Sequence, residues 1–181
     1  SELSIPYLCI ATDIANGEAY EMTRGNLQRS IRASMSIPFY FTPVEVDGRL
    51  LIDGGMRNNF PVQNLRDKGV DIIIGVDVQR NFHTKEEINS LTKILDQMIA
   101  ITDIDANKKA MEEIDIHIRP QLGSYGMMDF NSFDSIIAIG EEAAREYLPQ
   151  LKHLADSIRS IQEYTVERPD VKPLDTLYIV S

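Results

Sequence analysis

A short hairpin that runs into paired glycines constrains this chain more than any other feature. The segment VEVDGRLLIDGG occupies residues 44–55, and an Asp-Gly pair at residues 47–48 separates two runs of β-forming residues. Such a pair predicts a two-residue type I′ turn, because both central residues of that turn need a positive φ. The second strand leads directly into Asp53, so the sequence predicts a carboxylate held at the end of a strand.

The two glycines after this aspartate, Gly54 and Gly55, admit two interpretations. Glycine allows backbone angles that strain other residues, and it lets a neighbouring group approach the backbone closely. Asp and Gly are also the residues that dominate ordinary turns. The motif alone is therefore compatible both with a functional carboxylate at Asp53 and with a plain turn.

The composition is that of a globular protein with an acidic surface. Apolar residues make up 43% of the 181 residues, and the formal net charge is −10. A negative surface repels phosphate backbones, so we do not expect nucleic acid to be a partner. No apolar run approaches the ~18 residues that a membrane-spanning helix requires.

Metal and cofactor sites are not predicted. Cys9 is the only cysteine, and it lies in the apolar run YLCIA, which predicts a buried and inert thiol. The three histidines, at positions 83, 117 and 153, show no metal-ligand spacing. The phosphate-loop and dinucleotide-binding glycine motifs are also absent from the sequence. We therefore expect neither a metal nor a cofactor.

The apolar periodicity predicts strands that alternate with helices. Besides the hairpin, strands are expected at residues 6–11, 18–23, 70–78 and 114–118. The nearly continuous apolar run at 70–78 predicts a central strand that is covered on both faces. Helices are expected at residues 27–35, 62–68, 88–102, 106–113, 132–148 and 149–161. A capping box at residues 84–87 precedes the third helix. This order of elements predicts a three-layer α/β domain.

An aromatic cluster, Phe39, Tyr40 and Phe41, follows the first predicted helix. Aromatic residues most often belong to a core, which is one interpretation of the cluster. The other interpretation is that the three side chains line an apolar pocket beside Asp53.

Four segments, in this order and spacing, resemble the patatin-like phospholipases. They are ATDIANGE (11–18), IRASMSIP (31–38), LIDGGMRNNFP (51–61) and IIGVDV (73–78). A later segment, IDIHIRPQLGSYGMMDF (114–130), is similar to an exported bacterial branch that continues into a small periplasmic domain and an outer-membrane barrel. The resemblance implies that residues 1–162 are the C-terminal part of a patatin domain. Residues 163–181 are then a linker or the start of a following domain. For the intact protein it implies the periplasm or outer membrane, with the cytoplasm as the alternative.

The resemblance also implies a chemistry, that of a lipid acyl hydrolase with a serine–aspartate dyad and no cofactor. Asp53, followed by Gly54 and Gly55, matches the general base of the family. The nucleophile motif G-x-S-x-G and the glycine-rich oxyanion loop are absent from this sequence. In the family both precede the segment that matches residues 6–13. We therefore expect a patatin-like fold that is incomplete at its N-terminus, lacks the strand and helix of the nucleophile elbow, and is inactive by itself.

Two other functions remain open at this point. The chain is either part of a non-catalytic pseudoenzyme or interaction module, or part of an enzyme that transfers the acyl group to an acceptor other than water. For the hydrolase, the expected partner is a lipid or phospholipid, and Phe39, Tyr40 and Phe41 are candidates for an acyl-binding groove. An uncovered sheet face further predicts that the fragment self-associates or is only marginally stable.

Overall fold

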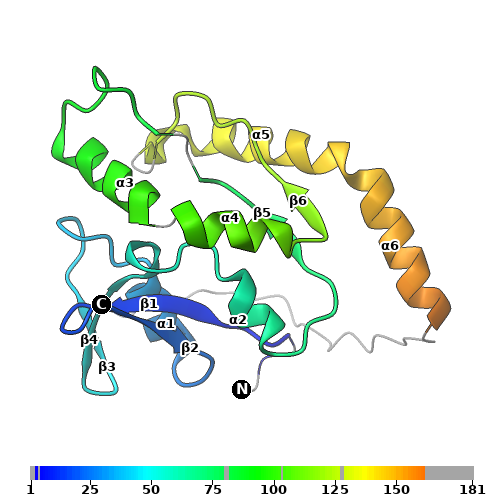
Figure 1. Ribbon diagram of the computed structural model, residues 1–181, viewed down its shortest axis with the longest axis horizontal. Helices are drawn as coiled ribbons and strands as arrows, with labels where there is room; N and C mark the ends of the chain where they lie inside the picture. The colour runs from blue at the N-terminus through cyan, green and yellow to red at the C-terminus, as the bar shows by residue number, and fades with distance from the viewer. Residues whose placement is uncertain (1–2, 4, 80–81, 103, 127–128, 162–181) are drawn as a thin grey trace, which may run out of the picture. The chain divides into compact units, whose positions relative to one another are not determined.

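The computed structural model describes residues 3, 5–79, 82–102, 104–126 and 129–161 (Figure 1). Helices and strands are mixed along the chain, which confirms the predicted α/β class. The strands are β1 (Cys9–Asp13), β2 (Glu18–Met22), β3 (Val44–Val46), β4 (Arg49–Asp53), β5 (Ile74–Val76) and β6 (Ile116–Ile118). The helices are α1 (Leu27–Ser34), α2 (Val62–Arg66), α3 (Leu91–Thr102), α4 (Ile104–Glu112), α5 (Phe133–Glu146) and α6 (Leu148–Ile161), with short 3₁₀ helices η1 (Gly54–Met56) and η2 (Phe130–Ser132).

The chain forms two compact units, residues 1–144 and 145–181. The first unit contains both sheets and the candidate site, and α6 belongs to the second unit. Pro149 is the second residue of α6 and lies in its first turn, where a missing backbone N–H is tolerated. The proposed linker at 163–181 lies outside the described residues.

The first sheet is antiparallel, with the strand order β2-β1-β4-β3. Asp47 and Gly48 have φ values of 51° and 75°, which confirms the predicted turn between β3 and β4. The strand predicted at residues 6–11 is shifted: β1 begins at Cys9 and ends at Asp13. The shift has a clear cause, because Asp13 still pairs with both neighbouring strands and so extends the ladder.

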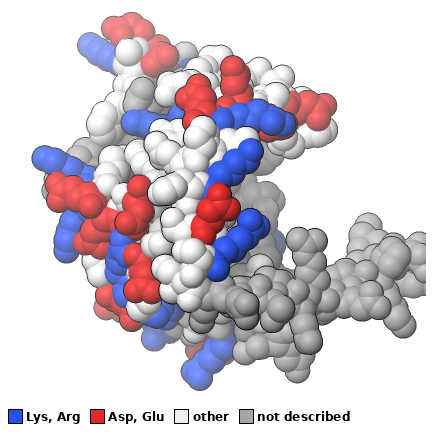
Figure 2. All heavy atoms as spheres, turned by 90° about the vertical axis from the view of Figure 1, so that its right-hand side faces the viewer, with Lys and Arg blue, Asp and Glu red and all other residues white. Residues whose placement is uncertain are grey.

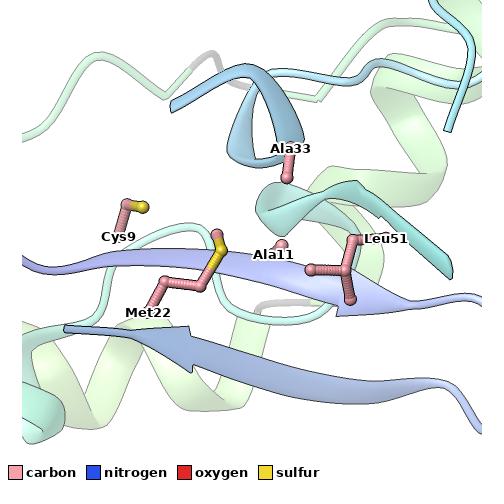
Figure 3. Close-up of a cluster of buried hydrophobic side chains, with 5 residues drawn as sticks. All are labelled: Cys9, Ala11, Met22, Ala33 and Leu51. Atoms are coloured by element: carbon pink, nitrogen blue, oxygen red, sulfur yellow. The ribbon is translucent and has the colours of Figure 1, made fainter. Parts of the chain in front are cut away.

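A small core joins this sheet to α1. The cluster of buried side chains comprises Cys9, Ala11, Met22, Ala33 and Leu51 (Figure 3). The helix begins where the sequence predicted, since the Asn26 side chain accepts a hydrogen bond from the backbone N–H of Arg29. Its small residues Ser30 and Ala33 are buried, whereas the apolar side chains of Leu27, Ile31 and Met35, spaced four residues apart, are 37–47% exposed.

The second sheet is the parallel pair β5 and β6, in which Ile74 is paired with Ile116. Helices α3 and α4 form the crossover that a parallel pair requires. One face of β5 is buried, but Ile74 and Val76 on the other face are about half exposed. The prediction of a strand covered on both faces is therefore wrong for the described residues. Among them β5 has β6 as its single strand neighbour, and none buries its second face.

The start of α3 also differs from the prediction. The Glu87 carboxylate accepts a hydrogen bond from the Thr84 backbone N–H at 2.8 Å, which is one half of the predicted capping box. Residues 85–87 nevertheless form a turn, and the helix begins only at Leu91. The helical hydrogen bonds start from Ser90, whose carbonyl oxygen accepts from the Ile94 N–H at 3.0 Å.

Candidate active site

Asp53 lies where three of the four family-like segments meet. It ends β4 and pairs with Ala11 of β1. Its backbone N–H donates to the carbonyl oxygen of Ser36 at 2.9 Å. Ser36 is fully buried, and its hydroxyl is bonded to the carbonyl and guanidinium groups of Arg32. The aspartate is thus fixed by β1 on one side and by the end of α1 on the other.

Close approach, rather than backbone strain, explains the two glycines. Neither Gly54 nor Gly55 has a positive φ, so the expectation of strained angles is wrong here. A Cβ added to Gly54 would overlap the carbonyl oxygen of Ile10, which belongs to rigid strand backbone. A Cβ added to Gly55 would lie 2.8 Å from Oδ1 of Asn59 and 3.0 Å from Oδ1 of Asp53. Only glycine therefore allows the turn to pack beneath the carboxylate.

The carboxylate of Asp53 is half-buried and held in one orientation. Its Oδ1 accepts a hydrogen bond from the Gly55 N–H at 2.8 Å. Burial raises the pKa of Asp53 above its ordinary value of 3.8, and the Gly55 hydrogen bond opposes part of that rise. A carboxylate with a raised pKa is a stronger base than an exposed one, which suits it to accept a proton.

Asp53 faces a cavity of about 350 Å³, within the size range of small-molecule sites. Gly55 also lines the cavity, and Asn59, Gln79 and Asp96 provide further polar groups. The rest of the lining is mainly apolar and includes Ile37, Val78, Ile99, Leu122, Tyr125 and Ile136. The site is thus a polar turn facing apolar walls, an arrangement that suits an ester with an apolar chain.

The predicted acyl-groove residues are not among those that line this cavity. Phe39 is 77% exposed and has a positive φ of 71°, a strained conformation for a bulky residue. Tyr40 is also exposed. The Phe41 ring instead lies against Arg32, with 4.9 Å from the guanidinium carbon to the ring centroid. The structure brings Asp53, Gly54 and Gly55 together, but it does not bring this cluster into the cavity.

Sequence reasoning missed the residues that form the cavity walls. Asp96, Ile99 and Ala100 come from one face of α3, and Ile136 comes from α5. One signal for Asp96 was available, since it is the one acidic residue in a predicted helix that is otherwise mostly apolar. The loop residues Leu122 and Tyr125 gave no periodic signal. Met127 and Met128, in the segment at 114–130, lie outside the described residues.

Three further observations concern nucleophiles, metals and membranes. None of the described residues that line the cavity is a serine, threonine or cysteine. Cys9 is buried in the core as predicted, and burial raises the pKa of its thiol. Residues 3–161, apart from the gaps in the description, contain no group of three metal-ligating side chains. In the same ranges no helix combines the length and apolar character needed to cross a bilayer.

Known proteins resemble this chain over the segment that contains Asp53. The family model described as patatin-like phospholipase matches residues 10–66, which include Asp53 and both glycines. Lysophospholipase NTE1 of Coccidioides immitis is 25% identical over 93% of this chain. Patatin-like phospholipase domain-containing protein 7 of Mus musculus is 28% identical over 80% of the chain, and Lysophospholipase NTE1 of Saccharomyces cerevisiae is 27% identical over 81%.

The fold and site define an α/β protein with an acidic residue at a glycine-rich strand end. The family-model match over residues 10–66 and these relatives support a patatin-like phospholipase family for this chain. The chain spans 10–13% of the length of these three relatives. The resemblance to the exported bacterial branch stays a prediction.

Proposed function

We propose that the intact protein is a lipid acyl hydrolase in which Asp53 is the general base of a serine–aspartate dyad. The observation that carries the proposal is the placement of Asp53: a half-buried carboxylate with a raised pKa that faces a mostly apolar cavity. The relatives named as lysophospholipases support hydrolysis of lipid esters as the reaction. We further propose that the serine lies on a segment outside this chain.

In the proposed reaction, Asp53 accepts the serine proton while the serine oxygen forms a bond to the ester carbonyl carbon. The bond between that carbon and the alcohol oxygen then breaks, and the proton passes from Asp53 to the departing alcohol. A water molecule releases the fatty acid from the serine in a second cycle of the same steps. Because all of these steps need the serine, the 181-residue chain alone is expected to be inactive.

The test is ester hydrolysis by the full-length protein and its Asp53→Asn variant. Loss of a general base lowers rates by about 10²–10⁴-fold, so we expect a decrease in kcat of that order. Asp67→Asn is a suitable control, because Asp67 is an exposed acid that is not among the residues lining the cavity. Equal rates for the wild type and Asp53→Asn, with both folded by circular dichroism, would exclude the proposed role.

The alternative is a non-catalytic patatin-fold module, which the lack of G-x-S-x-G in these 181 residues favours. The gene sequence upstream of the codon for Ser1 decides between the two. A G-x-S-x-G motif within some tens of codons supports the hydrolase, whereas a start codon at this position supports the module. Acyl transfer to an acceptor other than water uses the same dyad, and product analysis with added alcohols separates it from hydrolysis.

A further inference from the structure

We propose that the outer face of α3 is the surface by which the protein docks on an uncharged lipid surface. The face consists of Leu91, Ile94, Met98 and Ile101, which we call the α3 stripe. These residues recur at intervals of three and four, so they share one side of the helix. Their side chains are 44–61% exposed. The inference rests on the proposed function, since it takes the cavity beside α3 as the lipid site.

The opposite side of α3 forms part of the cavity wall. Asp96, Ile99 and Ala100 line the cavity with Asp53, and Leu95 is buried between the two sides. A helix with apolar residues on nearly all sides is normally buried in protein or in contact with lipid. The two sides of α3 have different surroundings: its inner side faces the proposed reaction site, and its outer side is exposed.

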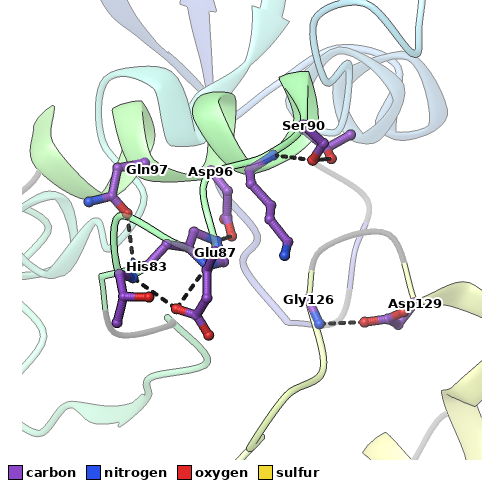
Figure 4. Close-up of polar contacts among 10 residues, drawn as sticks. His83, Glu87, Ser90, Asp96, Gln97, Gly126 and Asp129 are labelled. Atoms are coloured by element: carbon purple, nitrogen blue, oxygen red, sulfur yellow. Dashed lines mark hydrogen bonds and ion pairs between the residues drawn. The ribbon is translucent and has the colours of Figure 1, made fainter.

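A partly buried polar network fixes the rotation of α3 about its axis (Figure 4). The His83 side chain is 2% exposed, and its Nε2 lies 2.8 Å from Oδ2 of Asp96. The backbone N–H of His83 donates to Oε1 of Gln97 at 2.8 Å. Because two successive residues of α3 are held by one buried residue, the helix cannot turn to bury the stripe without breaking both contacts.

The charge of the protein indicates which kind of lipid surface the α3 stripe contacts. The two charged residues of α3, Lys93 and Asp96, both lie away from the stripe on the helical wheel. The chain carries a net charge of −10, which opposes approach to an anionic membrane. Figure 2 looks onto the right-hand side of Figure 1, away from α3, and acidic and basic side chains are interspersed on that side. An uncharged or zwitterionic lipid surface is therefore the complementary partner.

Vesicle binding by the full-length protein tests the proposal. Measured in the Asp53→Asn background, so that lipid is not consumed, the protein is expected to bind phosphatidylcholine vesicles more tightly than phosphatidylglycerol vesicles. Adding Ile94→Gln and Ile101→Gln should weaken phosphatidylcholine binding at least about tenfold, or ~1.4 kcal/mol. The matched control is Leu27→Gln with Ile31→Gln on α1, which has a similarly exposed stripe that does not line the cavity. This control should bind like its parent.

A milder variant keeps the test decisive if the double glutamine variant fails to fold. Ile94→Trp preserves the apolar surface, and the chain itself contains no tryptophan. Its fluorescence, after subtraction of the parent signal, should shift to shorter wavelength when phosphatidylcholine vesicles are added. No shift, or unchanged vesicle binding by the glutamine variant, overturns the proposal.

A fall in molar mass of the glutamine variant without vesicles also overturns the proposal, because the stripe would then contact a second copy. Failure of the proposed function is distinguishable from failure of docking. Undiminished hydrolysis by Asp53→Asn would exclude the proposed serine–aspartate dyad. Vesicle binding is measured without hydrolysis, so its result tests docking alone.

Discussion

Strands β1 and β5 have similar apolar sequences but lie in different environments. Both are short apolar runs that follow the pattern of a buried strand. All five residues of β1 are buried, because β2 and β4 flank it and α1 packs on the sheet. In β5 only Gly75 is buried, and Ile74 and Val76 are exposed. A continuous apolar run therefore predicts that a strand is buried, but whether its side chains are buried depends on which other elements pack against it.

The difference in burial between β1 and β5 coincides with the range that the family model matches. Residues 10–66, which the model covers, include β2, β3, β4, all of β1 except Cys9, and the turn at Asp53. The second sheet lies outside that range, and its exposed face is where we expect further protein to pack. The comparison implies that substitutions should cost more stability in the first sheet than in the second.

The largest expected effect is the truncation of the first core. Leu51 is fully buried, so Leu51→Ala should lower the free energy of unfolding by ~2–5 kcal/mol. Ile74→Ala in β5 removes a half-exposed side chain and should cost less than ~1 kcal/mol. Leu50→Ala is the matched control, because Leu50 is the exposed neighbour of Leu51 in the same strand. Urea denaturation measures all three, and equal costs for Leu51 and Ile74 would contradict the comparison.

A smaller difference is expected between two buried glycines, one in each region. In Gly54→Ala the new methyl group meets the backbone oxygen of Ile10, which cannot move without distorting β1. We expect a loss of ~1–3 kcal/mol in the free energy of unfolding. In Gly75→Ala the methyl group meets the ends of the Ile114 and Phe60 side chains, which can shift, so the loss should be under ~1 kcal/mol. Thermal denaturation measures both variants. A greater loss of stability in Gly75→Ala than in Gly54→Ala would contradict this prediction.

The features of the fold and site that the sequence predicted are those that depend on residues close together in the chain. The turn at Asp47 and Gly48, the start of α1 at Leu27 and the position of Asp53 at the end of a strand depend on nearby residues, and all three were predicted. The cavity depends on α3, a loop and α5, which lie far apart in the sequence, so no short motif could reveal it. The exposed face of β5 was not predictable either, because exposure depends on partners that a strand's own residues do not specify.

Self-association is the next expected consequence of the exposed β5 face. An exposed apolar face is stabilised when it packs against a second copy of the chain, because its side chains are then removed from water. We expect the 181-residue chain to show a molar mass above that of a monomer in light scattering. Ile74→Lys with Val76→Lys should lower that mass, whereas Ala19→Lys on β2 of the first sheet should leave it unchanged. A monomeric wild-type chain with no dependence on concentration would contradict this prediction.

The smallest expected effect concerns two acids, Asp53 at the end of β4 and Asp115 just before β6, whose pKa values shift in opposite directions. Burial raises the pKa of Asp53 above 3.8, so the folded state holds its proton more tightly than the unfolded state does. Stability then falls as the pH rises from 3.8 through the raised pKa. Asp53→Asn removes this loss, so the variant should gain unfolding free energy relative to wild type at neutral pH but not below pH 3.8.

For Asp115 the sign is reversed. Hydrogen bonds from the backbone N–H of Ile73 and from Arg66 lower the pKa of Asp115 below 3.8, so the charged form stabilises the fold. That contribution is present above pH 3.8 and is lost as the pH falls through the lowered pKa. Asp115→Asn should therefore lose unfolding free energy at neutral pH and match the wild type in strong acid. Urea denaturation at several pH values measures both variants, and shifts of the same sign would show that the two carboxylates do not differ in environment as the structure places them.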